Sequence, residues 1–213
     1  MRTSFFRFLV GLALISGGAR AQLAGAAGSV FRVQNFDIAE LCTIHSYPSQ
    51  TIAGSGVTVS GDRGASCASD VFAYQFARAS AATFSVEFIP EYRAGGNGYP
   101  EGNILGSTSR VMSAHTLGIR LMAPLQSRIS AYGSLGGGVG GFEYPTVLPT
   151  APPVLSQTLT YHGVVEFGGG LDIRLWRRFS LRGEVRDFVT GQGLSGVPGR
   201  NHVLEAIGVG FHF

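Results

Sequence analysis

The chain has 213 residues, of which 45% are apolar and 14% are charged, and glycine is about twice as frequent as in an average protein. The length suits a single domain. All 16 basic residues are arginine, three of them within the first 21 positions, so the remaining chain has 13 arginines against 13 acidic residues. This neutral balance removes the electrostatic support for a nucleic-acid partner.

The first 21 residues have the features of a secretory signal peptide. Arg2 and Arg7 precede an apolar stretch at residues 8–15, and residues 19–21 form the small-x-small pattern of a cleavage site. This apolar run is far shorter than the roughly 20 residues that span a membrane as a helix. We expect cleavage before Gln22, which leaves residues 22–213 as one exported domain.

Export would place both cysteines, Cys42 and Cys67, in an oxidising compartment. Neither belongs to a Cys-x-x-Cys motif, and the five histidines lack ligand spacing, so a disulfide is favoured over a metal site. Closing a loop of this size would stabilise the fold by roughly 3 to 4 kcal/mol.

Alternation of apolar and polar residues predicts seven β-strands after residue 70 and an eighth, of mixed polarity, before it. The clearest alternation is at residues 159–175, where large apolar residues occupy one parity and polar or small residues occupy the other. No segment after Gln22 has convincing helical spacing. The predicted strands cover residues 30–38, 71–78, 83–93, 116–122, 128–142, 159–175, 179–189 and 202–213.

Short and long connections alternate between these strands. Residues 79–82, 123–127 and 176–178 form short links, whereas residues 39–70, 94–115, 143–158 and 190–201 form long ones. In an up-and-down barrel, this order places every long loop at one rim and every turn at the other, as in transmembrane β-barrels. Both cysteines then fall in the first long loop. The predicted fold is therefore an all-β, eight-stranded, antiparallel transmembrane barrel that follows a cleavable signal peptide.

The polar parity of the predicted strands carries charged residues that would all face the lumen. An eight-stranded barrel is only wide enough to be filled by side chains, so these groups are expected to pair as a polar plug. A soluble ligand-binding barrel would have the inverse arrangement, with apolar residues inside. Asp187 and Glu205 fall on the lipid-facing parity and are expected near the outer rim. The predicted lumen residues are Glu87, Glu91, Arg93, Arg120, Glu166, Asp172, Arg174, Arg182, Glu184 and Arg186.

The alternating close at residues 202–213, together with residues 168–174 and 179–188, resembles the small bacterial outer-membrane β-barrel proteins of the OmpA-barrel, OmpX and Ail type. The resemblance implies a non-enzymatic protein of a Gram-negative-type outer membrane, with a structural, adhesive or minor permeability role and functional outer loops. It implies contact with membrane lipid and lipopolysaccharide, a possible surface ligand of the loops, and no cofactor or nucleic acid. Phe211 and Phe213 match the C-terminal aromatic signal that the family's barrel-assembly machinery reads.

Two other functions compete with this interpretation. Some barrels of this size are lipid A acyl hydrolases, and Ser113 and His115 share one parity near the outer end of a predicted strand, as acyl transfer would need. The His-x-Ser-Asn pattern of those enzymes is absent, and no carboxylate is placed in the sequence to orient His115. A soluble secreted barrel that binds a small apolar ligand is the other alternative.

Overall fold

The computed structural model describes residues 35–213 apart from residues 48, 53, 80–81, 99–107, 125–127 and 191–200, so the predicted signal peptide lies outside the described residues. The described residues form ten β-strands and no helix. Accordingly, none of this part of the chain is a helix with the length and hydropathy needed to cross a membrane. The strands are β1 (Phe36–Tyr47), β2 (Gln50–Thr51), β3 (Thr58–Val59), β4 (Asp62–Ala79), β5 (Ala82–Gly98), β6 (Thr108–Pro124), β7 (Ile129–Leu148), β8 (Val154–Arg174), β9 (Phe179–Thr190) and β10 (Val203–His212).

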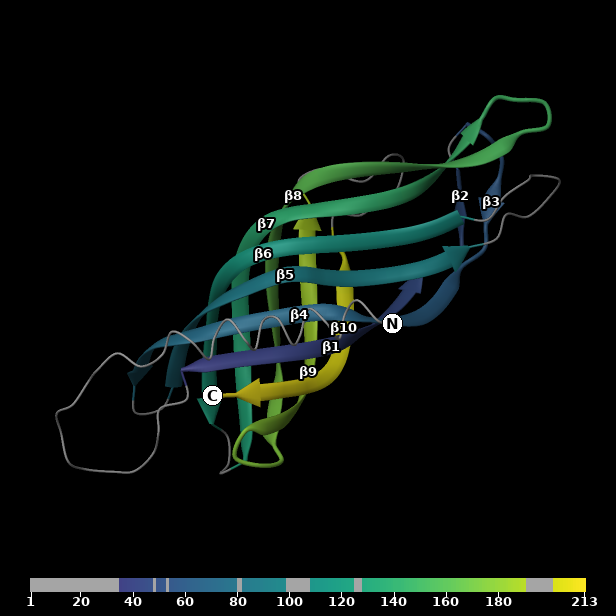
Figure 1. The fold of residues 1–213 in the computed structure, drawn as a ribbon. Helices are drawn as coiled ribbons and strands as arrows, with labels where there is room; N and C mark the ends of the chain where they lie inside the picture. The colour runs from purple at the N-terminus through teal and green to yellow at the C-terminus, as the bar shows by residue number, and fades with distance from the viewer. Residues whose placement is uncertain are drawn as a thin grey trace, which may run out of the picture. The chain divides into compact units, whose positions relative to one another are not determined.

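Eight strands close into an antiparallel barrel in the order β1-β10-β9-β8-β7-β6-β5-β4, and β4 pairs back with β1 (Figure 1). The first and last strands meet at a seam, where the amide nitrogens of Phe36 and Phe213 each donate to the other's carbonyl oxygen at 2.9 Å. Strands β2 and β3 form a separate small sheet within the β1–β4 connection. The all-β antiparallel architecture predicted from alternation is confirmed.

The connections divide the barrel into two ends. Residues 80–81, 125–128 and 175–178 connect strands at one end, which we call the turn end. The tightest described turn joins β8 to β9, where the amide nitrogens of Leu175 and Trp176 donate to the carbonyl oxygen of Phe179 at 2.9 and 3.1 Å. Longer connections at residues 48–61, 99–107, 149–153 and 191–202 lie at the other end, which we call the loop end.

Several strands are longer than predicted, and the first is displaced. Strand β1 covers Phe36–Tyr47 instead of residues 30–38, of which residues 30–34 lie outside the described part. Most of the predicted loop at residues 143–158 is paired, since β7 and β8 continue together until Leu148 opposes Val154. Backbone pairing between strands does not require one face to be apolar. The strands therefore continue beyond the segments in which apolar and polar residues alternate.

Glycine allows close packing of adjacent strands at the centre of the barrel wall. A Cβ atom on Gly138 of β7 would overlap the carbonyl oxygen of His115 on β6, and one on Gly118 of β6 would overlap that of Leu135 on β7. The glycines at these two positions are therefore explained by the close approach of the two strand backbones.

Candidate functional site

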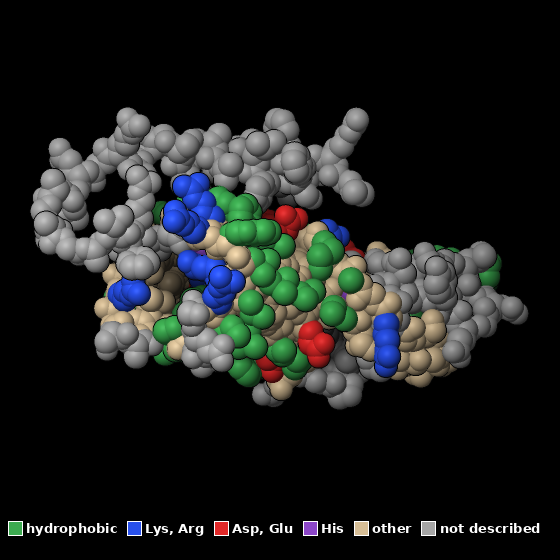
Figure 2. Space-filling model, turned by 90° about the horizontal axis from the view of Figure 1, so that it is seen from below, with side chains coloured by type: hydrophobic (Ala, Val, Ile, Leu, Met, Phe, Trp, Pro, Cys, Tyr) green, Lys and Arg blue, Asp and Glu red, His purple; other side chains and the backbone are tan. Residues whose placement is uncertain are grey.

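The outer surface of the barrel is apolar around most of its circumference. On β8, Val165, Phe167 and Leu171 are 54%, 48% and 45% exposed. Figure 2 shows the apolar side chains as a broad green surface on one side of the molecule. Soluble monomers rarely expose a continuous apolar surface of this kind. Strands β5, β6, β9 and β10 contribute Phe84, Val86, Phe88, Leu117, Ile119, Leu121, Leu181, Val185, Ile207 and Val209.

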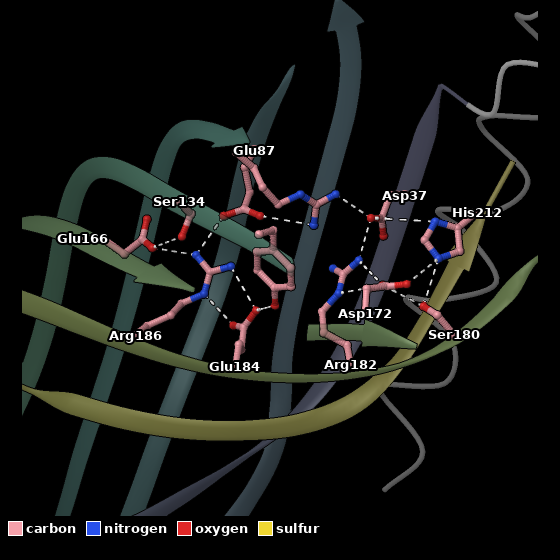
Figure 3. A network of polar contacts seen from close by, with 12 residues as sticks. Asp37, Glu87, Ser134, Glu166, Asp172, Ser180, Arg182, Glu184, Arg186 and His212 are labelled. Atoms are coloured by element: carbon pink, nitrogen blue, oxygen red, sulfur yellow. Dashed lines mark hydrogen bonds and ion pairs between the residues drawn. The ribbon is translucent and has the colours of Figure 1, made fainter. Parts of the chain in front are cut away.

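The interior near the turn end is a network of charged and polar side chains, drawn in Figure 3. Its first centre is Arg182, which is completely buried on β9. Nη2 of Arg182 donates to Oδ2 of Asp37 on β1 at 2.6 Å and to Oδ2 of Asp172 on β8 at 3.0 Å. The Ser180 hydroxyl lies 2.8 Å from Asp172 and 2.9 Å from Nε2 of His212 on β10. This centre joins β1, on one side of the seam, to β8, β9 and β10 on the other.

The second centre is Arg186, also completely buried on β9. Its Nη1 atom lies 2.8 Å from Glu87 on β5 and 2.7 Å from Glu166 on β8, and its Nε atom lies 2.5 Å from Glu184. Ser134 on β7 donates to Glu166 at 2.9 Å. One guanidinium thus holds three carboxylates from three strands, which is the fork geometry that arginine offers.

Arg120 on β6 and Tyr132 on β7 connect the two centres. Arg120 lies 2.5 Å from Asp37 in the first centre and 3.4 Å from Glu87 in the second. The Tyr132 hydroxyl donates to Glu184 at 2.5 Å, and Cζ of Arg120 and Arg182 lie 5.5 and 5.4 Å from the centroid of its ring. The cation–π contacts add to the pairing, so the two centres form one charged network.

The charged network has more carboxylates than guanidiniums. Arg120, Arg182 and Arg186 face Asp37, Glu87, Glu166, Asp172 and Glu184, and all eight are buried. His212 lies 3.9 Å from Asp37 and 3.7 Å from Asp172, so its protonated form would reduce the excess of negative charge. Ion pairs between buried side chains of different strands restrict how these strands can be arranged.

An apolar layer closes the lumen between the charged network and the loop end. Tyr92 on β5 and Phe188 on β9 are 0% exposed, and their ring centroids lie 5.1 Å apart. Cζ of Arg186 lies 5.7 Å from the Tyr92 centroid, where the two regions meet. The sequence predicts polar residues throughout the lumen, whereas this region also contains a cluster of buried apolar side chains. The layer consists of Ala39, Leu41, Val71, Ile89, Tyr92, Ala94, Met112, Ala114, Phe142, Val164, Phe188, Leu204 and Ala206.

Seven residues of the charged network are among those that the sequence predicts in the lumen, namely Glu87, Arg120, Glu166, Asp172, Arg182, Glu184 and Arg186. Arg174 is half-buried at the last position of β8, by the turn end. Sequence reasoning missed Asp37, Tyr132, Ser134, Ser180 and His212. The alternation of β9 and β10 placed Ser180 and His212 on the inward parity, which was the available signal.

A β-bulge explains the two predicted lumen residues that lie elsewhere. The pairing of β5 with β6 shifts between Ile89 and Tyr92, so the parity of β5 reverses there. Tyr92 therefore enters the lumen, and Arg93 is exposed, so the predicted lumen position of Arg93 is wrong. Glu91 lies at the bulge, half-buried and in register with Asp70, and makes none of the described contacts of the charged network.

Acidic residues also lie on the outward parity. Asp187 is buried near the loop end, where its Oδ1 atom accepts a hydrogen bond from the amide nitrogen of His202 at 2.9 Å. Glu205 is exposed on β10. On β1, Glu40 is exposed between Phe36 and Ile44, which are 39% and 50% exposed. The predicted first strand ends at residue 38, so the sequence prediction does not include Glu40 in the barrel wall.

Aromatic and imidazole rings cover the apolar layer at the loop end. The Phe142 centroid lies 4.8 Å from that of His202 and 5.9 Å from that of His162. Burial lowers the pKa of His202, which precedes the first residue of β10, and the nearby Asp187 carboxylate acts in the opposite direction. The neutral imidazole is therefore favoured against the Phe142 ring.

The two cysteines form a disulfide across adjacent strands. Cys42 on β1 and Cys67 on β4 are register partners next to a bulge, with Cα atoms 3.8 Å apart. The pairing agrees with the sequence prediction, but the predicted location in a loop is wrong. Both strands extend further towards the loop end than their alternation indicated, so the cross-link joins two strands of the barrel wall.

The alternative hydrolase site lacks an assembled catalytic pair. Nδ1 of His115 contacts the carbonyl oxygen of Pro90, and His115 is exposed on β6. Ser113 is half-buried two positions away, and the described contacts include no hydrogen bond between its hydroxyl and His115. No group of three or more His, Cys, Asp or Glu side chains in the described residues could hold a metal ion.

Comparison with known proteins gives likenesses in structure. No family model and no curated protein matches the sequence. Ail, the attachment invasion locus protein of Yersinia pestis, is 13% identical with a TM-score of 0.45, over 84% of this chain and 97% of that chain. OprG from Pseudomonas aeruginosa is 16% identical with a TM-score of 0.47, over 84% and 96%. Neisserial surface protein A is 12% identical with a TM-score of 0.44, also over 84% and 96%. All three are small outer-membrane β-barrel proteins, the class that the sequence resembles.

Proposed function

We propose that the chain is a non-enzymatic β-barrel of a Gram-negative-type outer membrane, with its eight barrel strands spanning the bilayer. The observation that carries this proposal is the polarity of the wall: Phe167 and Leu171 of β8 are exposed, while Glu166 and Asp172 beside them are buried among arginines. A lipid-facing exterior and an ion-paired interior are what a small membrane barrel requires. A soluble barrel for an apolar ligand requires the reverse.

The filled lumen supports a structural or surface-contact role over conduction. The charged network and the apolar layer together occupy the interior, and an apolar layer resists the entry of hydrated ions. At the loop end, β7 and β8 continue as a two-stranded hairpin beyond the last β7 partner of β6, Phe142. Its exposed apolar residues, Leu148, Val154 and Leu159, make it the candidate contact surface for an external partner.

The proposal includes export and assembly. Signal-peptide cleavage before Gln22 would deliver the domain to the periplasm. Phe211 and Phe213, whose ring centroids lie 5.1 Å apart on the seam strand, would be read by the barrel-assembly machinery. The apolar exterior would then contact membrane lipid and lipopolysaccharide.

The test is fractionation of expressing cells followed by gel electrophoresis of the detergent-folded protein with and without boiling. We expect the protein in the outer membrane and a mobility that changes on boiling, because a closed barrel resists detergent until it is heated. Mass spectrometry of the same material should find Gln22 at the N-terminus. A water-soluble protein with one mobility would overturn the proposal and favour the secreted ligand-binding barrel.

A further inference from the structure

The turn end of the barrel is strongly basic. Residues 78–83, 124–129 and 174–179 contain five arginines and no acidic residue. The loop-end connections at residues 48–61, 99–107, 149–153 and 191–202 contain one Glu and one Arg. Positive charge is therefore concentrated in the segments at the turn end of the barrel. The five arginines are Arg78, Arg128, Arg174, Arg177 and Arg178.

Four of these arginines lie on adjoining segments of the wall. The amide nitrogen of Arg174 donates to the carbonyl oxygen of Arg128 at 2.7 Å, which joins the ends of β7 and β8. The carbonyl oxygen of Arg178 accepts from the amide nitrogen of His212 at 2.8 Å, which joins the β8–β9 turn to β10. Arg128, Arg177 and Arg178 are exposed, and Figure 2 shows basic side chains gathered at one end of the apolar surface.

Aromatic side chains border the same end. Ring centroids are 4.9 Å apart for Phe179 and Phe211, 6.2 Å for Phe213 and Phe36, and 5.0 Å for Phe36 and Tyr74. These pairs run along β9, β10, β1 and β4. Trp176, in the β8–β9 turn, is 71% exposed and adjacent to Arg177. Aromatic girdles of this kind lie at the boundary between hydrocarbon and headgroups in membrane barrels.

We propose that the turn end binds the headgroups of anionic phospholipids in the adjoining leaflet, through Arg128, Arg177 and Arg178. This inference rests on the proposed membrane insertion. Guanidinium groups bind phosphate oxygens in forked pairs, and arginines just beyond an aromatic girdle lie at the depth of the lipid phosphates. A membrane lipid is favoured over free phosphate, because the bordering apolar residues Leu175, Trp176 and Phe179 are 49%, 71% and 44% exposed and fit the acyl region.

The single tryptophan of the chain makes this testable, because Trp176 reports only on the lipids beside these arginines. The full chain is folded into phosphatidylcholine vesicles that contain a small fraction of either brominated phosphatidylglycerol or brominated phosphatidylcholine. We expect the anionic brominated lipid to quench Trp176 at severalfold lower mole fraction, since one arginine at a membrane surface contributes roughly a fivefold preference.

The test variant is Arg177→Gln with Arg178→Gln, and its matched control is Arg63→Gln, an exposed arginine on β4 towards the loop end. Trp176 of the double variant should lose most of the preference for the anionic lipid, because only Arg128 of the three arginines remains, while the control should keep the full preference. Equal quenching by the two brominated lipids in the unchanged protein would overturn the inference. Inorganic phosphate at about 10 mM is compared with chloride of equal ionic strength. Loss of the lipid preference in phosphate alone would also overturn the inference, because the site would then bind free phosphate. Heat-modifiable mobility is checked in each sample, because its loss would indicate failure of membrane insertion and not of lipid selection.

Discussion

Arg186 and Glu184 lie two positions apart on β9, and both side chains enter the lumen, where Nε of Arg186 lies 2.5 Å from Oε1 of Glu184. Residues with this spacing share one face of a strand, so the ion pair is built into the local geometry. The same guanidinium also holds Glu87 and Glu166 from β5 and β8. Local pairing on one strand thus orients an arginine that connects distant parts of the barrel.

Replacement of Arg186 should therefore be strongly destabilising. Arg186→Met keeps the length of the side chain but leaves three buried carboxylates without their common partner, which should lower the free energy of unfolding by about 3–5 kcal/mol. Urea unfolding of the folded barrel in micelles, followed by Trp176 fluorescence, measures this value. Adding Glu87→Gln and Glu166→Gln should restore part of the loss. An Arg186→Met protein as stable as the unchanged one would contradict the assigned network.

An arginine on the lipid-facing surface should impair insertion. Leu171→Arg and Val209→Arg place a charge on exposed positions of β8 and β10, and such a charge costs about 2–4 kcal/mol at mid-depth in the bilayer and less near its interfaces. The larger effect is expected at Leu171, because Val209 lies two residues from Phe211. The yield of heat-modifiable protein in vesicles should fall. Leu148→Arg is the control, because Leu148 is 44% exposed at the end of the β7–β8 hairpin. Equal yields for all three variants would remove the lipid-facing assignment.

Glu40 should be a site where an apolar substitution stabilises the inserted protein. Its carboxylate is exposed on the outward parity of β1, opposite Val209 of β10. Carboxylates cost less than arginines on a lipid face, so Glu40→Leu should gain on the order of 1–2 kcal/mol in bilayers. Unfolding in vesicles measures the gain, and Glu40→Gln should give an intermediate value. A loss of stability in both variants would show that the Glu40 carboxylate has a partner in the inserted protein.

The apolar layer should limit ion passage. Phe188→Ala removes a completely buried ring that packs against Tyr92, and such a change costs about 3–5 kcal/mol. Because the cavity lies between the charged network and the loop end, planar-bilayer conductance should rise above that of the unchanged protein. The control is Phe167→Ala on the exterior of β8, which should leave the conductance unchanged. Identical conductance of both variants would argue that another part of the lumen limits passage.

Removal of the disulfide should lower stability without changing the fold. Cys42 and Cys67 are 25 residues apart in sequence, and a cross-link of this span stabilises by about 3 kcal/mol on the chain-entropy account. A Cys42→Ser, Cys67→Ser double variant should unfold at lower urea concentration and still show heat-modifiable mobility. A mobility difference between reduced and non-reduced unfolded protein checks that the cross-link is present in the starting material.

The barrel class could be predicted from the sequence because alternation is a direct consequence of a wall with two different faces. Leu171 and Asp172 are adjacent, and their opposite environments follow from parity alone. Parity cannot reveal a bulge, and the one between Ile89 and Tyr92 reversed the assignment of Arg93. The bulge residues include Pro90, which cannot donate a backbone hydrogen bond and was the available signal.

The apolar layer was missed for a different reason. Its residues come from many strands and share no motif, and several are small, such as Ala39, Ala94 and Ala114. The residues of the apolar layer meet because they lie at the same level along the barrel axis. That level depends on the register of every strand pair. The register of β1 was inaccessible, because its alternation is interrupted by Glu40 on the outer face and apolar Leu41 on the inner face.

The seam between β1 and β10 has a consequence for the order of events in folding. It joins the strand that is synthesised first in the barrel to the one synthesised last, and Asp37 meets Arg182 across 145 positions of sequence. Contacts of such separation close large loops and form late. Until β10 arrives, β1 and β9 each expose a free edge that can pair with another molecule. The unfinished sheet therefore needs protection from aggregation until its last strand is in place.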